Sequence, residues 1–258
     1  FIFIKRTYYF MKKKALIVSD SVYLATGFST VARNIYHLIK DEYDTRFFSI
    51  IPHIQIKNIP VNYISNKEKD LAENFFYVIN TFSPDIVISI SDIWRLDFLY
   101  HVKLKKHFRW LAYVPVEGRF FPEKVFNSGK QHDTVKYLNY SEHLIAYSDF
   151  GKKELEQFRN VDSYIYHGVD NEVFREINLE KGLKKNLFPE FDNPFVFLSI
   201  GDNMVRKRYD LLLKSWKKFK TEKINACLLL LTHPVSPVNG WNIPLLLKRL
   251  GIEDSVFY

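Results

Sequence analysis

The sequence is short of the residues that build disulfides and metal centres. It has one cysteine, Cys227, so the chain cannot form an intramolecular disulfide. Cys227 lies in the apolar run ACLLLL at 226–231 and is predicted to be a buried strand residue. No histidine or cysteine pair has the spacing of zinc ligands, and the aspartates of SDIWRLD at 91–97 are too far apart for a paired-aspartate metal motif. We therefore expect no metal and no cofactor.

Long apolar runs are also missing. None approaches the ~20 residues that a membrane-spanning helix needs, and the opening FIFI is too short for the core of a signal peptide. With a single cysteine, these features lead us to expect a cytoplasmic protein, with peripheral contact at the inner membrane face as a further expectation.

The net charge of the chain excludes few classes of binding partner. The formal net charge is +8 and the isoelectric point is about 9.3, which suits nucleic acid, an anionic membrane surface or phosphorylated small molecules. The lysines are spread along the chain and no nucleic-acid-binding motif is recognisable, so we expect no nucleic-acid partner.

Apolar runs alternate with helix-length amphipathic segments, a pattern that is typical of βα units around a parallel sheet. The hydrophobic content of 47% is ample for a packed core. The sequence therefore predicts an α/β fold, with strands at 15–20, 46–51, 61–64, 83–91, 110–116, 143–148, 195–200 and 226–231.

The pattern divides the chain into segments. We expect Met11 to be the natural start, with residues 1–10 a non-native upstream segment. Residues 11–170 predict one complete domain, and the polar stretch 171–194 with its two prolines predicts a linker. Residues 195–258 hold only two βα units, whose sheet would have an open edge. We therefore expect the chain to be a fragment.

Ligands of parallel α/β sheets bind at the carboxyl ends of the strands, which directs attention to the loops that follow them. One loop, in GDNMVRKRYDLL, places Arg206, Lys207 and Arg208 together at the start of a helix. A helix start carries partial positive charge, so three cations there are unfavourable unless something offsets them. An anionic ligand would do so, and a solvated surface turn would also tolerate the cluster.

Four segments resemble, in order, those of family 4 of the glycosyltransferases: ATGFSTVARNI, HLIAYSDFGKKELEQF, YIYHGVDNEVF and FLSIGDNMVRKRYDLLLKSW. The resemblance implies the GT-B fold, in which two Rossmann-like domains face each other across a nucleotide-sugar. Residues 11–170 would be the complete, acceptor-side domain, and 195–258 the first half of the donor domain. It also implies retention of configuration and no metal.

The resemblance assigns roles in the donor loop. Lys207 matches the lysine that reaches the donor diphosphate. The position of an earlier arginine is taken by Asp202, a departure that Arg206 could compensate, because a guanidinium binds phosphate oxygens bidentately. Asp202 beside a diphosphate would need to pair with Arg206 or Arg208. Asp202 and Asn203 are candidate cleft residues.

In the first domain, Gly27 matches a loop that closes over the donor phosphates and the acceptor, although an ordinary βα turn explains it equally well. Glu117 lies where many members of the family have a histidine beside the sugar, which makes it a candidate catalytic carboxylate. A structural pair with Arg119 is the alternative. Ser148 either faces the cleft or, like Asp149, caps the helix that follows.

The expected function is transfer of a sugar from a nucleoside diphosphate sugar to an acceptor hydroxyl of a glycan, lipid or protein. The family's paired-glutamate motif would fall beyond Tyr258, so we expect the fragment to be inactive by itself. Two alternatives stay open. One is another GT-B sugar-nucleotide enzyme, such as an epimerase, and the other is a non-catalytic basic binding protein.

Overall fold

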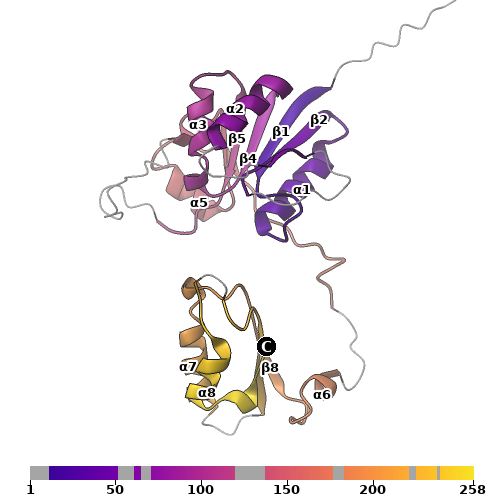
Figure 1. The fold of residues 1–258 in the computed structure, drawn as a ribbon, viewed down its shortest axis with the longest axis vertical. Helices are drawn as coiled ribbons and strands as arrows, with labels where there is room; N and C mark the ends of the chain where they lie inside the picture. The colour runs from indigo at the N-terminus through magenta and orange to yellow at the C-terminus, as the bar shows by residue number, and fades with distance from the viewer. Residues whose placement is uncertain are drawn as a thin grey trace, which may run out of the picture. The chain divides into compact units, whose positions relative to one another are not determined.

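The computed structural model describes residues 12–51, 61–64, 71–119, 137–176, 183–220, 225–236 and 239–258. The expected start at Met11 therefore lies outside the described residues. Contacts divide the chain into two compact units, residues 1–170 and 171–258 (Figure 1).

Among the described residues of the first unit, seven strands form one parallel sheet in the order β3-β2-β1-β4-β5-β6-β7. The strands are β1 Lys13–Ser19, β2 Tyr43–Ser49, β3 Val61–Ile64, β4 Ile86–Ile90, β5 Arg109–Val114, β6 His143–Ala146 and β7 Ser163–Tyr164. The α/β class predicted from the apolar runs is confirmed, and each expected strand of this unit is present within a few residues of its predicted bounds.

Helices lie on both sides of this sheet (Figure 1). Leu16 and Val18 of β1 pack in the core on the side of α2 and α3, with Phe75, whereas Ile17 packs with Ala32 of α1 on the other side. A strand buried on both faces requires a continuous apolar run, which is why ALIV does not alternate with polar residues. The helices are α1 Gly27–Ile39, α2 Leu71–Phe82, α3 Asp97–Lys103 and α5 Asp149–Leu155.

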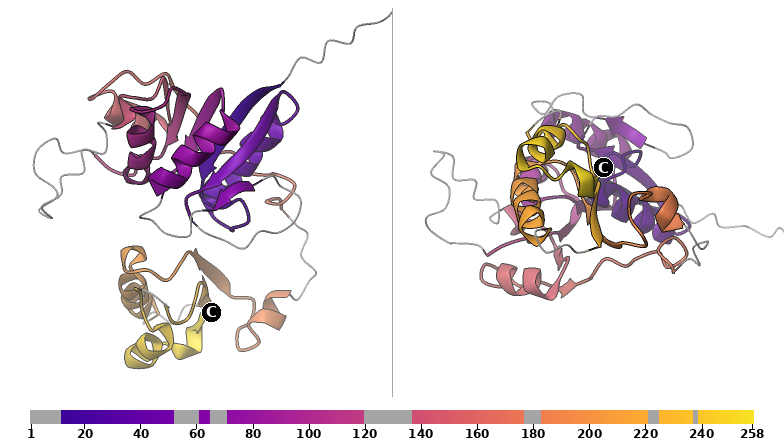
Figure 2. Two further views of the ribbon diagram at one scale, coloured as in Figure 1. Left: turned by 45° about the horizontal axis from the view of Figure 1, so that its top comes forward. Right: turned by 90° about the horizontal axis from the view of Figure 1, so that it is seen from below.

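The second unit has a parallel sheet of three strands among its described residues, in the order β10-β9-β8. Helices α7 and α8 lie together on one side of it (Figure 2), where Leu213 and Leu247 pack against Leu228. Cys227 is fully buried, as predicted. The elements are α6 Leu183–Leu187, β8 Phe195–Ile200, α7 Tyr209–Phe219, β9 Ala226–Leu231, α8 Ile243–Leu250 and β10 Val256–Phe257.

Two observations concern the amino-terminal stretch of the second unit and its edge strand. The stretch 171–194, expected to be a linker, belongs to this unit and contains α6. Its Phe188 is buried, with its ring centroid 4.9 Å from that of Phe257. β8 is the edge strand of the sheet, and its Leu198 and Ile200 are 55% and 69% exposed.

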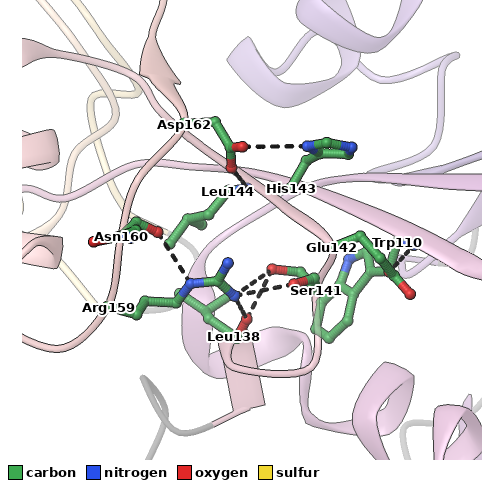
Figure 3. Close-up of polar contacts among 9 residues, drawn as sticks. All are labelled: Trp110, Leu138, Ser141, Glu142, His143, Leu144, Arg159, Asn160 and Asp162. Atoms are coloured by element: carbon green, nitrogen blue, oxygen red, sulfur yellow. Dashed lines mark hydrogen bonds and ion pairs between the residues drawn. The ribbon is translucent and has the colours of Figure 1, made fainter.

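Carboxylates cap the amino ends of two central strands of the first unit (Figure 3). Glu142 accepts a hydrogen bond of 2.6 Å from the backbone N–H of Trp110 in β5, and Asp162 accepts one of 2.7 Å from Leu144 in β6. These bonds satisfy backbone groups at the strand ends. They lie at the edge of the sheet opposite the carboxyl ends, and we assign them a structural role.

The ionisation of Asp162 leads to a prediction about how the stability of the protein depends on pH. Its hydrogen bond from Leu144 and its contact of 3.3 Å with His143 lower the pKa of Asp162 below the ordinary value of 3.8. A lowered folded-state pKa means that the stabilisation is present above the unfolded-state pKa and is lost as the pH falls through the folded-state pKa. We expect Asp162→Ala to lower the free energy of unfolding by about 1 kcal/mol at pH 7 and by less at pH 3, as measured by urea titration.

The exposed Asp41 provides the control for this measurement, because no ion pair or hydrogen bond of its side chain is present in the described part of the chain. Asp41→Ala should change the stability little at either pH. An Asp162→Ala penalty that stays constant between pH 7 and pH 3 would contradict the assigned origin of the pKa shift.

Candidate functional site

At the carboxyl edge of the first sheet, a partly buried ion pair links the loops after two adjacent strands. Asp20 directly follows β1 and is 5% exposed. Its Oδ1 accepts a hydrogen bond of 2.9 Å from Nη1 of Arg95, the last residue of the short helix η2 (Ile93–Arg95) after β4. Its Oδ2 accepts one of 3.1 Å from Oγ1 of Thr26. No local pattern in the sequence indicates this pair, because its members are 75 residues apart.

The start of α1 is held by the same group of side chains. Oγ1 of Thr26 accepts the N–H of Ser29 at 3.2 Å and so caps the helix. Gly27 is the first helical residue, and a Cβ placed on it would meet no atom within 4 Å. The helix has no acidic residue in its first turn. Gly27 is thus on an open helix start of the kind that suits an anion.

Glu117 and Ser148, the other sequence candidates in this unit, have different environments. Glu117 is exposed after β5 and forms no ion pair with Arg119, or with any other residue in the described ranges. Oγ of Ser148 accepts the N–H of Gly151 at 3.0 Å and caps α5. Of the two expected caps, Ser148 is therefore the one in the structure, and Asp149 is the first residue of the helix.

A cluster of aromatic rings lies at the carboxyl ends of β5 and β6 and in the segment after β7. The ring centroid of Tyr147 is 4.2 Å from that of Tyr113 and 4.2 Å from that of His167. Burial, with the charges of Tyr113 and Asp92 adding to it, raises the pKa of the Tyr147 hydroxyl. Burial lowers the pKa of His167. Both shifts favour neutral side chains at pH 7.

The loop between β8 and α7 in the second unit contains four of the sequence candidates: Asp202, Asn203, Arg206 and Lys207. Its short helix η3 (Val205–Lys207) carries the two cations. Both are exposed, and neither makes a side-chain hydrogen bond or an ion pair with any residue that the structure describes. The Cε of Lys207 lies 3.9 Å from the position that a Cβ of Gly201 would take.

Arg208 differs from its two neighbours. It adopts the left-handed conformation, with φ 54° and ψ 42°, at the start of α7. Its Nε and Nη2 each donate a hydrogen bond of 3.0 Å to the carboxylate of Asp210. Hydrogen bonding to Arg208 lowers the pKa of Asp210. Arg208 is thus already paired, whereas Arg206 and Lys207 are available to a ligand.

Asp202 is the acidic residue near the start of this loop. It is exposed, and in the described part of the chain it forms no ion pair with Arg206 or Arg208. Arg208 is paired with Asp210, two residues along the chain, and the pairing of Asp202 beside a bound diphosphate stays a prediction.

Asn203 is buried, with 3% exposure, and its amide is used within the protein. Nδ2 donates to the backbone oxygens of His233 at 2.9 Å and of Trp241 at 2.7 Å, and Oδ1 accepts the N–H of Trp241 at 2.9 Å. Both N–H groups of the amide are thus occupied. Asn203 holds loops together, and its partners are 30 and 38 residues away in the sequence.

No group of three or more histidine, cysteine, aspartate and glutamate side chains suited to a metal ion occurs among the residues that the structure describes. In the same residues, no helix combines the length and the apolar character needed to cross a membrane.

A scan against protein-family models finds no match, and neither does a search of the curated proteins. Solved structures do match. The chain is similar to Anabaena Alr3699/HepE in complex with UDP and glucose, with a TM-score of 0.64 and 14% identity over 95% of this chain and 68% of that one. It is also similar to the UDP-GlcNAc 2-epimerase of Neisseria meningitidis bound to UDP-GlcNAc, with a TM-score of 0.57 and 14% identity over 96% and 71%.

A third similar structure is an alpha-glucosyltransferase in complex with UDP-glucose and DNA containing an abasic site. Its TM-score is 0.50, with 12% identity over 93% of this chain and 60% of that one. At these identities the likeness concerns the fold. The chain has Rossmann-like units of the GT-B type, as expected from its sequence.

Proposed function

We propose that the protein is a sugar-nucleotide enzyme that transfers a sugar from a nucleoside diphosphate sugar to an acceptor hydroxyl, with retention, as in family 4 of the glycosyltransferases. The main support is that Arg206 and Lys207, after the carboxyl end of β8, are exposed and have no partner among the described residues. This is the edge of a parallel sheet at which ligands bind. The solved structures of the same fold that contain UDP or UDP-sugars add support.

In this proposal the two cations act on the diphosphate. Lys207 supplies a compact positive charge with three donors, and Arg206 a planar group that can bind two phosphate oxygens at once. Negative charge develops on the diphosphate as the bond to the sugar breaks, so fixed cations stabilise that transition state more than the ground state. Arg208 takes no part, because its guanidinium is held by Asp210.

In this proposal, residues of the first unit would contact the acceptor and the sugar. Gly27 leaves the start of α1 open to a phosphate or a hydroxyl oxygen. Glu117 is the candidate carboxylate for a sugar hydroxyl or for developing positive charge, and its exposure leaves it accessible. The acceptor is a hydroxyl of a glycan, a lipid or a protein. We propose a protein that works in the cytoplasm, with peripheral contact at the inner membrane face, and without a metal.

A second candidate function is epimerisation of a sugar nucleotide. The observation in its favour is the structural likeness to UDP-GlcNAc 2-epimerases. The two reactions share the nucleotide-sugar site and differ in product. NMR of the reaction with UDP-GlcNAc would show an epimerised sugar for one function and a glycosylated acceptor with released UDP for the other.

Ligand binding tests the proposal. Calorimetric titration of the 258-residue chain is expected to show binding of UDP and UDP-glucose, and weaker binding of UMP, because UMP lacks the second phosphate for the two cations. Transfer itself is measured separately, as release of UDP from UDP-glucose. Absence of UDP binding together with salt-sensitive DNA binding would instead favour the basic binding protein.

A further inference from the structure

We infer that Asn203 and Gly240 position the backbone that carries Arg206 and Lys207, so that the cations meet an anionic ligand in a fixed arrangement. We call this pair the Asn203–Gly240 lock. The identity of the anion, a diphosphate, rests on the proposed function, but the mechanical role of the lock can be tested without it.

The first part of the lock is the side chain of Asn203. Its three hydrogen bonds reach the carbonyl oxygen of His233, after β9, and both backbone groups of Trp241, just before α8. One side chain therefore ties together the loop after β8, the loop after β9 and the segment that leads into α8. Loss of the amide would remove the partner of three partly buried backbone groups, which is unfavourable.

The second part is the close approach of Gly240 to the backbone of Asn203. A Cβ on Gly240 would lie 2.0 Å from the carbonyl oxygen of Asn203 and 2.5 Å from the Cβ of Ser236. Atoms cannot approach so closely, and the obstacle is backbone rather than a flexible side chain. Only glycine lets segment 239–241 lie directly against the loop.

Arg206 and Lys207 come shortly after Asn203 in the sequence. The N–H of Val205, the first residue of η3, donates to the carbonyl oxygen of Asn239 at 3.2 Å. The loop is also held at its start, where the hydroxyl of Tyr209 donates to the carbonyl oxygen of Gly201 at 2.8 Å. The backbone of η3 is thus fixed to segment 239–241, while the side chains of Arg206 and Lys207 have no partner in the described part of the chain.

A fixed backbone that carries cationic side chains without partners in the described part of the chain is the arrangement expected of a preorganised binding site. Ordering a loop when a ligand binds would cost conformational entropy, and a loop that is already fixed avoids that cost. Two like charges next to each other also disfavour an ordered loop unless other contacts hold it. A purely structural role for the lock would explain the stability of the unit but would not make ligand affinity depend on it.

The test uses Gly240→Ala, which removes no group that a ligand would contact, and Asn203→Asp, which keeps the oxygen that accepts from Trp241 and loses the two donors. Asn225→Ala is the matched control, because it removes an exposed amide whose partner among the described residues is the carbonyl oxygen of Asp192, at 2.6 Å. Hydrogen exchange of backbone amides and calorimetric titration with UDP are measured on the full chain.

We expect the amides of Val205 and Lys207 to exchange about tenfold faster or more in both variants, because the loop opens locally more often. The amide of Leu228 in β9 should be unaffected, which shows that the sheet remains folded. Should one variant fail to fold, the other carries the test. Unchanged exchange at Val205 and Lys207 would overturn the lock, whether or not UDP binds.

For UDP we expect Gly240→Ala to lower affinity about as much as Lys207→Ala does. Adding Lys207→Ala to Gly240→Ala should then change little, because the two act on one interaction. Affinity that stays at the wild-type level while exchange accelerates would overturn the positioning role. If the wild-type chain does not bind UDP, the proposed function fails, and the exchange result alone decides the lock.

Discussion

Replacing Lys207 by alanine is expected to weaken UDP binding about ten- to a hundredfold, which is the effect of losing one hydrogen bond to a charged group, about 1.5–3 kcal/mol. The physical reason is that Lys207 is exposed and unpaired in the described part of the chain. Its removal takes away a cation that the ligand would contact, and the protein loses no hydrogen bond or ion pair of that side chain among the described residues. Calorimetric titration measures the affinity, and a thermal melt should be nearly unchanged.

Lys217→Ala is the matched control for this prediction, because Lys217 is an exposed lysine of α7 and its loss changes the net charge equally. It should leave UDP affinity within about twofold, as expected for a charge that acts only through a screened field. Equal losses in Lys207→Ala and Lys217→Ala would show a general charge effect instead of a site. Unchanged affinity in Lys207→Ala would remove it from the proposed diphosphate site.

Asp20→Ala is expected to lower the free energy of unfolding of the first unit by about 3 kcal/mol, the lower end of the range for breaking a buried ion pair, because this pair is only partly buried. Asp20 is 5% exposed and the side chain of Arg95 is 23% exposed, so the remaining guanidinium would be left largely out of water without its partner. Thr26 would lose its acceptor as well. Urea titration followed by far-ultraviolet circular dichroism gives the measurement.

The exposed pair of Asp44 and Arg46, 4.0 Å apart, provides the contrast. Asp44→Ala should cost less than about 1 kcal/mol, because a solvated ion pair contributes little. Removing Asp20 and Arg95 together should cost less than the sum of the two single changes, since the double variant leaves no unpaired charge. Additive losses would indicate that the two side chains stabilise the unit independently.

Strand positions followed from local sequence. The runs that became β1 and β4 are rich in apolar residues because both faces of these strands are covered, and a buried polar side chain without a partner would be costly. The cap at Ser148 also followed from local sequence, with an uncertainty of one residue against Asp149, since either side chain can reach the exposed amides of a helix start.

The donor loop shows where local sequence was insufficient. Arg206, Lys207 and Arg208 carry the same charge in adjacent positions, and composition cannot distinguish them. Arg208, whose backbone is left-handed, pairs with Asp210, whereas the other two have no partner among the described residues. Which of the three finds a partner depends on the geometry of the folded loop, which three consecutive basic residues do not reveal.

By itself, the sequence determined the α/β class, the positions of the strands and the loop in which the cations lie, because these depend on hydrophobic periodicity and on residues near one another in the chain. Only the tertiary structure decided that Asp20 pairs with Arg95, and that Asn203 binds the backbone of Trp241. Such contacts join residues far apart in the sequence. Their geometry arises when parallel strands bring their carboxyl ends to one edge, which no short stretch of sequence encodes.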